Sequence, residues 1–425
     1  MSDSRISKFF EKDYDERLEI IQNFSKLSDD EIEILNENTG GITFDNADKM
    51  VENVIGTFAL PLGIATNFKI NDKDYLIPMV IEEPSVVAAA SSGAKISRIK
   101  GGITASVDSA YSIGQIQVVD LDSKEIDKAI QEITESNSEI LQLANSKSTT
   151  LSSMNKGAKS IQCRVLSTDT DPMLIVEIMV DVADAMGANV TNTMCEVIAP
   201  MIEKLTGGRV LLRILSNYST NRMAHATAVF DKNAVGEDVV NDMILAAKFA
   251  KYDPYRAVTH NKGIMNGLIA VANAVGQDNR AIEAAANAYA SKNGKYTSLT
   301  EWSKDKDGNL VGKLVIPLSV GIIGGITKVH PIARICMNIL GVESGKELAC
   351  VMVAVGLVQN FSAMRALVTD GIQKGHMRLH ARNIACSVGA KSEEIDGIVE
   401  QMVKENNISI RRAKEIYAKL DSNKN

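Results

Sequence analysis

The feature that most constrains the fold of this chain is a change in residue periodicity near residue 110. From there to about residue 220, strand-type and helical patterns follow in the order strand, helix, strand, strand, helix, strand. That order is typical of a ferredoxin-like split βαβ module. The first helical stretch, 123–145, predicts one long surface helix. We therefore predict a small ferredoxin-like domain at 110–220, inserted into a larger domain.

The segments on both sides of this module are mostly helical by pattern, and they predict one large domain made of residues 1–109 and 221–372. Within it, Pro84 and the alanine-rich stretch that follows predict a tightly packed internal helix with Pro84 in its first turn. Residues 373–425 are more charged and predict a separate small helical unit. The predicted fold class is α+β, with a large, mostly helical domain and a small inserted one.

Charge and apolar content exclude several classes of protein. With 46 basic and 53 acidic residues, the net charge of −7 disfavours binding to nucleic acid. The longest strongly apolar run, Leu348–Val358, is far shorter than the ~20 residues of a membrane-spanning helix, and the polar N-terminus lacks the apolar core of a signal peptide. Five widely separated cysteines are typical of a reducing compartment. We predict a soluble cytoplasmic protein with no membrane or nucleic-acid partner.

The common catalytic fingerprints are missing from the sequence. It has no G-x-G-x-x-G dinucleotide motif, no P-loop, no G-x-S-x-G nucleophile motif and no H-E-x-x-H zinc motif. Rossmann-type, kinase, hydrolase and zinc-enzyme interpretations therefore lose most of their support, and no metal site is expected. The remaining candidates for chemistry are polar residues within apolar, small-residue stretches.

Two such stretches contain charged residues that suit acid–base chemistry. Glu82 and Glu83 stand between a predicted strand and helix, where burial would make one of them an acid catalyst; alternatively, they interact with the helix dipole. Lys262 lies in a nearly uncharged helix, and Asp278 follows it after the break at Gly276. A lysine held by a carboxylate stabilises an oxyanion, but a surface lysine and a helix-capping aspartate explain the same pattern.

Two further stretches suit proton transfer and phosphate binding. His376 and His380 are four residues apart, but a zinc pair would lack a third ligand, so a proton donor beside an anion-binding or structural histidine is the better functional interpretation. The stretch 184–189 ends a strand and opens a helix. Its backbone N–H groups could bind phosphate with Gly187 allowing close approach, or it could simply be a helix start.

Together these stretches resemble the class II 3-hydroxy-3-methylglutaryl-coenzyme A (HMG-CoA) reductases, in the family's order from about residue 50 to 400. The matching segments are ENVIGTFALPLG (52–63), EEPSVVAAAS (82–91), DAMGANVTNTMCE (184–196), RILSN (213–217), DPYRAVTHNKGIMNG (253–267), GQDNRAIEAAANAYA (276–290), GIIGGITKVHP (321–331) and VGLVQNFSAMRALVTDGIQKGHMRLHARNIA (355–385). The resemblance implies interconversion of HMG-CoA and (R)-mevalonate plus CoA with two NAD(P)H. This four-electron reaction passes through mevaldyl-CoA and mevaldehyde, and it serves isoprenoid biosynthesis or mevalonate catabolism.

The resemblance also implies a role for each matching residue. Glu83 matches the catalytic glutamate, Lys262 the oxyanion-stabilising lysine, and Asp278 the aspartate that holds both. His376, on a C-terminal flap at 373–425, matches the proton donor to the departing CoA thiolate. The positions that match substrate contacts are Ser85, Arg256, Asn266 and Asn360, and those that match cofactor contacts are Asp184, Met186, Gly187, Asn189 and Asn217.

The resemblance extends to the cofactor and to the assembly. Members that use NADH carry an acidic residue just beyond the long helix of the small domain, where a carboxylate would repel the 2′-phosphate of NADPH. Here the stretch 144–150 has no carboxylate, and Ser148 stands at the matching position. We therefore expect NADPH to be preferred over NADH. The family implies a homodimer with shared active sites, with a trimer of dimers as the larger alternative.

Two departures from the family's pattern matter. The stretch 9–12 aligns poorly, so Lys12 is only a candidate contact for the CoA phosphate. At 91–94 small residues replace an expected aromatic, which predicts looser local packing. Two other functions stay open from the residues: a non-catalytic CoA-binding or regulatory relative, against which the intact catalytic positions argue, and another acyl-CoA or aldehyde reductase.

Overall fold

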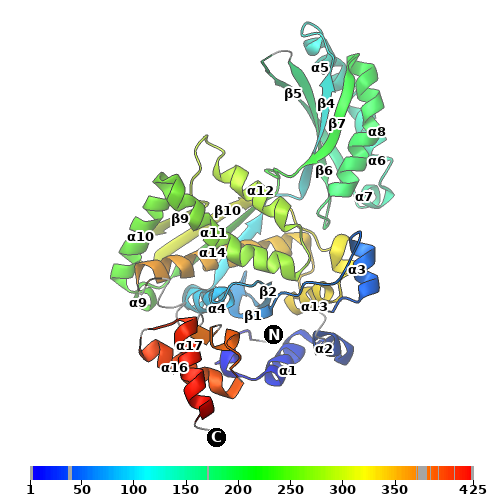
Figure 1. Cartoon of the computed structure of the whole chain (residues 1–425). Coiled ribbons are helices and arrows are strands. Elements are labelled where there is room, and N and C mark those ends of the chain that lie inside the picture. The colour runs from blue at the N-terminus through cyan, green and yellow to red at the C-terminus, as the bar shows by residue number, and fades with distance from the viewer. Residues whose placement is uncertain are drawn as a thin grey trace.

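The computed structural model describes residues 3–36, 41–169, 172–369, 371, 381–382, 384–390, 392–405 and 407–422. Figure 1 shows a small body, built from residues of the middle of the chain, that protrudes from a larger one. Two separate clusters of buried apolar residues fill them, one within 65–364 and one within 116–210. This separation supports the proposed division into a large and an inserted domain.

The large domain contains a six-stranded sheet in the order β2-β1-β3-β8-β10-β9. The strands are β1 (Leu62–Ile70), β2 (Lys73–Val80), β3 (Ile103–Val107), β8 (Met223–Phe230), β9 (Thr300–Lys304) and β10 (Leu310–Pro317). β3 pairs antiparallel with β8, although the whole inserted domain lies between them in the sequence. The sheet is thus more extensive than the helical pattern predicts, and β3 was not anticipated.

Helices cover this sheet and surround one apolar helix. They are α4 (Val86–Ser97), α9 (Lys232–Val235), α10 (Glu237–Tyr252), α11 (Pro254–Ala274), α12 (Asn279–Ala290), α13 (Pro331–Leu340) and α14 (Gly345–Val368). α14 is long and apolar enough to cross a membrane, with a mean hydropathy of 1.5, but 67% of that window is buried inside the protein. It is therefore a core helix of the large domain.

The contact between α4 and α14 overturns the prediction of loose packing at 91–94. A Cβ on Gly93 would lie 2.4 Å from Ser362 Oγ and 2.8 Å from Val358 Cγ1, well inside van der Waals contact. The Ser362 hydroxyl also donates to the Ala89 carbonyl at 2.7 Å. The small side chains therefore let the two helices approach closely, and they tighten the packing because an aromatic ring would not fit.

The small domain has the predicted ferredoxin-like order, which is confirmed. Its antiparallel sheet runs β5-β6-β4-β7, built from β4 (Tyr111–Val119), β5 (Gly157–Leu166), β6 (Met173–Asp181) and β7 (Arg209–Ser216). The helices are α5 (Ile126–Glu135), α6 (Asn137–Asn145), α7 (Thr149–Ser153) and α8 (Ala188–Thr206). The single long helix predicted at 123–145 is wrong, because the chain divides it at Ser136 into α5 and α6.

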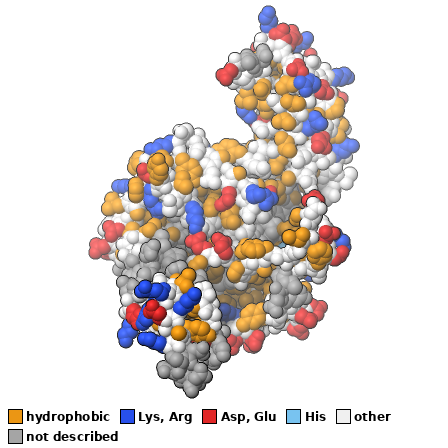
Figure 2. All heavy atoms as spheres, in the orientation of Figure 1, with side chains coloured by type: hydrophobic (Ala, Val, Ile, Leu, Met, Phe, Trp, Pro, Cys, Tyr) orange, Lys and Arg blue, Asp and Glu red, His pale blue; other side chains and the backbone are white. Residues whose placement is uncertain are grey.

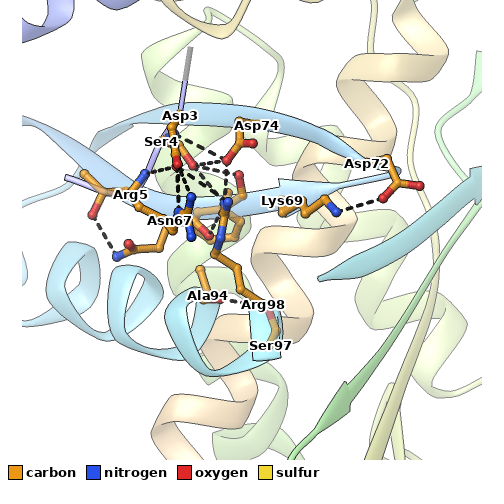
Figure 3. A network of polar contacts seen from close by, with 12 residues as sticks. Asp3, Ser4, Arg5, Asn67, Lys69, Asp72, Asp74, Ala94, Ser97 and Arg98 are labelled. Carbon is orange, nitrogen blue, oxygen red and sulfur yellow. Dashed lines mark hydrogen bonds and ion pairs between the residues drawn. The ribbon is translucent and has the colours of Figure 1, made fainter. Parts of the chain in front are cut away.

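The N-terminal segment is fastened to the large domain before its helices α1 (Tyr14–Ser25), α2 (Asp29–Asn36) and α3 (Phe44–Met50). Ser4 is fully buried, and its hydroxyl donates to Asp74 at 2.7 Å and to the Phe68 carbonyl at 3.1 Å. Arg98 bonds the same Asp74 carboxylate (Figure 3). At the other end of the chain, α16 (Ser392–Lys404) and α17 (Ile410–Ser422) form an apolar cluster of their own with residues from 381 onward.

Candidate active site

The structure brings Glu83 and Lys262 together across 179 positions of sequence. Lys262 Nζ on α11 lies 2.6 Å from Glu83 Oε2, in the turn between β2 and α4. Asn266, one helical turn beyond Lys262, donates to the same oxygen at 3.4 Å. The lysine side chain is 57% exposed and that of the glutamate 33%. A pair this exposed contributes typically no more than ~1 kcal/mol to stability, so its value lies in placing a cation and a carboxyl group side by side.

The turn that carries Glu83 has an unusual backbone. Ser85 has a φ of 73°, in the left-handed region, and its side chain makes no capping hydrogen bond to α4. A non-glycine residue held there costs roughly 1–3 kcal/mol and often marks a functional turn. The prediction that Pro84 occupies the first turn of the helix is wrong, because α4 begins at Val86. The tight turn directs Glu83 toward α11.

Asp278 stands apart from this pair. Its carboxylate caps α12, accepting from the Arg280 and Ala281 backbone N–H groups at 3.1 Å each, and it pairs with the Arg280 side chain at 3.2 Å. Within the described ranges it makes no hydrogen bond or ion pair with Glu83 or Lys262. The structure therefore shows the helix-capping arrangement, and the contact implied by the resemblance is not formed.

A buried polar network supports α11 directly below Lys262. His260 Nε2 lies 2.6 Å from Thr300 Oγ1 on β9, and both residues are buried. Asn360 Oδ1 accepts from Thr300 at 3.1 Å and from Trp302 Nε1 at 3.0 Å. Asn360 is only 1% exposed, so the structure places this expected substrate contact in the support of α11. The signal for the network was a histidine two residues before Lys262 in a nearly uncharged helix.

Burial lowers the pKa of His260 to about 3, with repulsion from Arg256 as a further cause. The unfolded imidazole takes up a proton near pH 6.5 whereas the folded one stays neutral, so acid favours the unfolded chain. We expect His260 to remove up to about 1.4 kcal/mol of stability per pH unit between pH 6 and pH 4. Urea unfolding followed by circular dichroism should show this extra slope in the wild type and not in His260→Gln. Parallel slopes would contradict it.

Arg256, another expected substrate contact, lies six residues before Lys262 on α11. Burial lowers the pKa of its guanidinium, and in the described part of the chain no carboxylate lies within ion-pair distance of it. The rise per residue places it about 9 Å along the helix axis from Lys262. An arginine whose guanidinium has no carboxylate partner in the described residues is suited to bind the carboxylate of a ligand.

Four of the predicted cofactor residues gather where β6 leads into α8. Gly187, with a φ of 102°, is the N-cap of α8, and no side chain caps the free N–H groups of the first turn. Asp184 Oδ1 accepts from the Gly345 N–H at 2.9 Å, so this segment contacts the large domain. Ser148 lies elsewhere in the small domain and caps α7, with its hydroxyl accepting from the Leu151 N–H at 3.4 Å. Met186 and Asn189 flank Gly187, whereas Asn217 lies in the turn after β7.

Several sequence expectations fall outside this arrangement. His376 and His380 lie outside the described residues. Among the residues described, no cluster of three or more histidine, cysteine or acidic side chains could hold a metal ion. Lys12 lies 3.7 Å from Glu16 in an ion pair between a half-buried lysine and an exposed glutamate. Two surface hollows, one beside α8 and one beside α13, are lined by none of the candidate residues. The side chains of the Glu83–Lys262 pair are partly exposed.

Comparison with known proteins identifies a family for this chain, which combines a large domain, an inserted ferredoxin-like domain and a lysine–glutamate pair. The model of the family "Hydroxymethylglutaryl-coenzyme A reductase" matches residues 13–381. The chain belongs to this family. It is therefore an oxidoreductase of the mevalonate pathway that acts on HMG-CoA.

Individual members of the reductase family are similar over most of the chain. The 3-hydroxy-3-methylglutaryl-coenzyme A reductase of Archaeoglobus fulgidus is 52% identical over 99% of this chain and 95% of its own length. The probable reductase of Borreliella burgdorferi is 36% identical over 79% of this chain and 77% of its own. The class II reductase of Streptococcus pneumoniae, in a structure bound to NADPH in open conformations, has a TM-score of 0.81 and 37% identity, covering 96% of this chain and all of the other. The predicted resemblance to class II reductases is confirmed.

Proposed function

We propose that Glu83, Lys262, Asp278 and His376 carry out the two reduction steps from HMG-CoA to mevalonate. The observation that supports this most directly is the 2.6 Å contact between Lys262 Nζ and Glu83 Oε2. The reduced nicotinamide, when bound, supplies a hydride in each step. Every other function below belongs to side chains of this chain.

Lys262 stabilises the charge that develops on oxygen. When a hydride adds to the thioester carbon, the carbonyl oxygen becomes an alkoxide, and the lysine ammonium donates to it. Collapse of that adduct releases the CoA thiolate, which His376 protonates from the C-terminal flap. In the second step Glu83, in its protonated form, gives a proton to the mevaldehyde oxygen as the second hydride arrives. Asp278 would join Glu83 and Lys262 only after a movement of the start of α12, since it caps that helix here.

Substrate recognition is proposed for the residues around α11. Arg256 is suited to the free carboxylate of HMG-CoA because a guanidinium can hold a carboxylate through two parallel hydrogen bonds. Ser85 and Asn266 flank Glu83 and can bind the substrate's hydroxyl and carbonyl oxygens. Asn360 acts indirectly, through its contacts with Thr300 and Trp302.

One assay tests this function against the alternatives. The purified protein is incubated with HMG-CoA and reduced nicotinamide, and both nicotinamide absorbance and mevalonate are followed. We expect about two nicotinamides to be oxidised for each mevalonate formed. Oxidation with other acyl-CoA substrates only would favour a different reductase, and no turnover at all would favour a non-catalytic CoA-binding relative.

The residues at the start of α8 fit a dinucleotide, because free backbone N–H groups at a helix start attract phosphate. Gly187 also leaves no room for a larger residue, since a Cβ there would lie 2.6 Å from Val182. We propose that Asp184, Met186, Gly187, Asn189 and the more distant Asn217 contact the cofactor. The Streptococcus pneumoniae relative was solved with NADPH, and this supports NADPH as the preferred cofactor here.

Ser148→Asp should shift the preference from NADPH toward NADH, because the new carboxylate repels a 2′-phosphate and can accept from a ribose hydroxyl. Aspartate is also a good helix N-cap, so α7 should be retained. The measurement is kcat/KM with each cofactor on both proteins. Ser153→Asp, at the other end of α7, is the matched control and should keep the wild-type ratio. A wild-type preference for NADH, or an unchanged ratio in Ser148→Asp, would remove Ser148 from this role.

We further propose that the enzyme works as a cytoplasmic homodimer with shared active sites. The exposed side chain of Lys262 leaves room for a second chain to complete the site. Figure 2 shows hydrophobic side chains among charged ones on the protruding small domain, and strands β5 and β7 expose Val165, Leu212 and Ile214. Light scattering should give a mass of at least twice the 45.9 kDa of one chain. A fully active monomer would contradict the shared site.

The described cysteines are all free, as in a reducing compartment.

A further inference from the structure

Arg222 is a buried arginine at the junction of the two domains. It precedes β8, where the chain returns from the small domain to the large one, and it is only 4% exposed. Its Nη1 donates to the Met186 carbonyl at 2.8 Å and to Ser319 Oγ at 3.0 Å, and its Nη2 donates to the Val320 carbonyl at 2.7 Å. Both nitrogens also lie 3.4 Å from the Ala185 carbonyl. The guanidinium thus joins the segment before α8 to the segment after β10.

Other contacts fix the same two segments to one another. The Ile322 N–H donates to the Asp184 carbonyl at 2.8 Å, and Gly321 leaves no space for a side chain because a Cβ there would lie 2.4 Å from the Met186 nitrogen. The Gly321 N–H in turn donates to Gln277 Oε1 at 3.0 Å, next to Asp278. A continuous set of contacts therefore runs from the cofactor segment to the start of α12.

A buried guanidinium without a carboxylate partner contributes little net stability to a fold. Removing a cation from water is unfavourable, and carbonyl oxygens offset this penalty less completely than a carboxylate does. Among the described residues no carboxylate lies within ion-pair distance of Arg222. Burial lowers the pKa of Arg222 to about 10, so the side chain keeps its charge at neutral pH. Its planar fork reaches acceptors on two segments at once, which the single ammonium of lysine does not.

We propose that Arg222 is a positioning residue for nicotinamide dinucleotide binding, which holds the Ala185 and Met186 carbonyls against Ser319 and Val320. It thereby sets where the start of α8 stands relative to Lys262 and Glu83 on the large domain. The proposal rests on the proposed function in one respect, that the segment 184–189 contacts the cofactor. Arg222 itself need not touch the cofactor.

The test compares Arg222→Met and Arg222→Lys with a matched control, Arg209→Met. Arg209 lies on β7 and forms an ion pair with Asp120 between exposed side chains. Arg209→Met therefore removes an arginine near the small domain's surface without disturbing the junction of the two domains. Isothermal titration calorimetry gives the Kd of NADPH in the absence of HMG-CoA, and the Kd of HMG-CoA in the absence of NADPH, for each protein. We expect the NADPH Kd to rise at least tenfold in Arg222→Met and less in Arg222→Lys. The HMG-CoA Kd should stay within twofold in both, and the control should leave both constants unchanged.

A second measurement needs no cofactor and separates this proposal from the proposed function. Amide hydrogen exchange at Ile322 and Gly345, which donate to Asp184, should be faster in Arg222→Met and unchanged in Arg209→Met. If the wild type binds no NADPH, the assignment of the cofactor segment fails, and exchange alone then decides the role of Arg222. A lower melting temperature with unchanged NADPH Kd and unchanged exchange would overturn the proposal and leave Arg222 as a stabilising residue only. Should Arg222→Met not fold, Arg222→Lys provides the same readouts.

Discussion

Lys262→Ala should abolish the reduction of both HMG-CoA and free mevaldehyde. Both steps pass through a negative charge on oxygen, and Lys262 Nζ is the cation that the structure places beside Glu83 at 2.6 Å. Loss of one preorganised donor to such an oxyanion costs typically ~10²–10³ in rate. The decisive measurement is kcat for each substrate at saturating cofactor. Both values should fall together by at least a hundredfold.

The control for this substitution is Lys248→Ala, an exposed lysine on α10 outside the site. Lys248→Ala should keep wild-type rates for both substrates. Its melting temperature should equal that of Lys262→Ala, so that the loss of activity in Lys262→Ala is not a loss of stability. The double variant Lys262→Ala with Glu83→Gln should lose little more activity than Lys262→Ala alone, because groups that act as a unit are not additive. Normal mevaldehyde reduction by Lys262→Ala would show that another group stabilises the alkoxide.

His376→Ala should separate the two substrates that Lys262→Ala affects equally. Reduction of HMG-CoA releases a thiolate that needs a proton, and loss of a positioned general acid costs ~10²–10⁴ in rate. Free mevaldehyde releases no thiolate, so its reduction should stay close to the wild-type rate. Steady-state kinetics with each substrate on one preparation gives the ratio directly.

His225→Ala serves as the matched histidine control, since His225 on β8 faces Asp108 rather than the site. It should leave the ratio of the two rates unchanged. Equal losses for HMG-CoA and mevaldehyde in His376→Ala would refute the role of His376 as the acid for the thiolate. Because His376 lies outside the described residues, its role rests on the resemblance to the family.

Local patterns were enough to predict the small domain, because its strand and helix periodicities alternate along the chain in the order of a known module. That module implies the order β5-β6-β4-β7, in which only β5 and β6 are consecutive in sequence. The large-domain sheet could not be predicted in the same way. Its central pair, β3 with β8, joins residues 103–107 to 224–228 across the inserted domain. Nothing in either short strand's own sequence specifies a partner so far away.

The candidate site likewise could be predicted only in part: the sequence indicates which residues take part, whereas their contacts depend on how the helices pack. The resemblance assigned Glu83 and Lys262 to one site with Asp278 holding both, and the structure places the first two in direct contact. It could not show that Asp278 caps α12 or that Asn360 is buried beneath α11, because both depend on how helices pack. Arg222 was missed altogether. Its only signal in the sequence is a charged residue at the start of an apolar strand, which is common and becomes informative only when its acceptors are known.

The buried network below α11 also has a use as an optical probe. Trp302 is the single tryptophan of the chain, it is 8% exposed, and its indole N–H donates to Asn360 and Thr300. Phe230 and Phe361 lie beside it, with ring centroids 5.9 and 6.2 Å away. Its fluorescence therefore comes from one known place in the large domain and is blind to unfolding confined to the small one. A change in emission when a ligand binds would report on the network that supports α11, which reaches this helix through Thr300 and His260, two residues before Lys262.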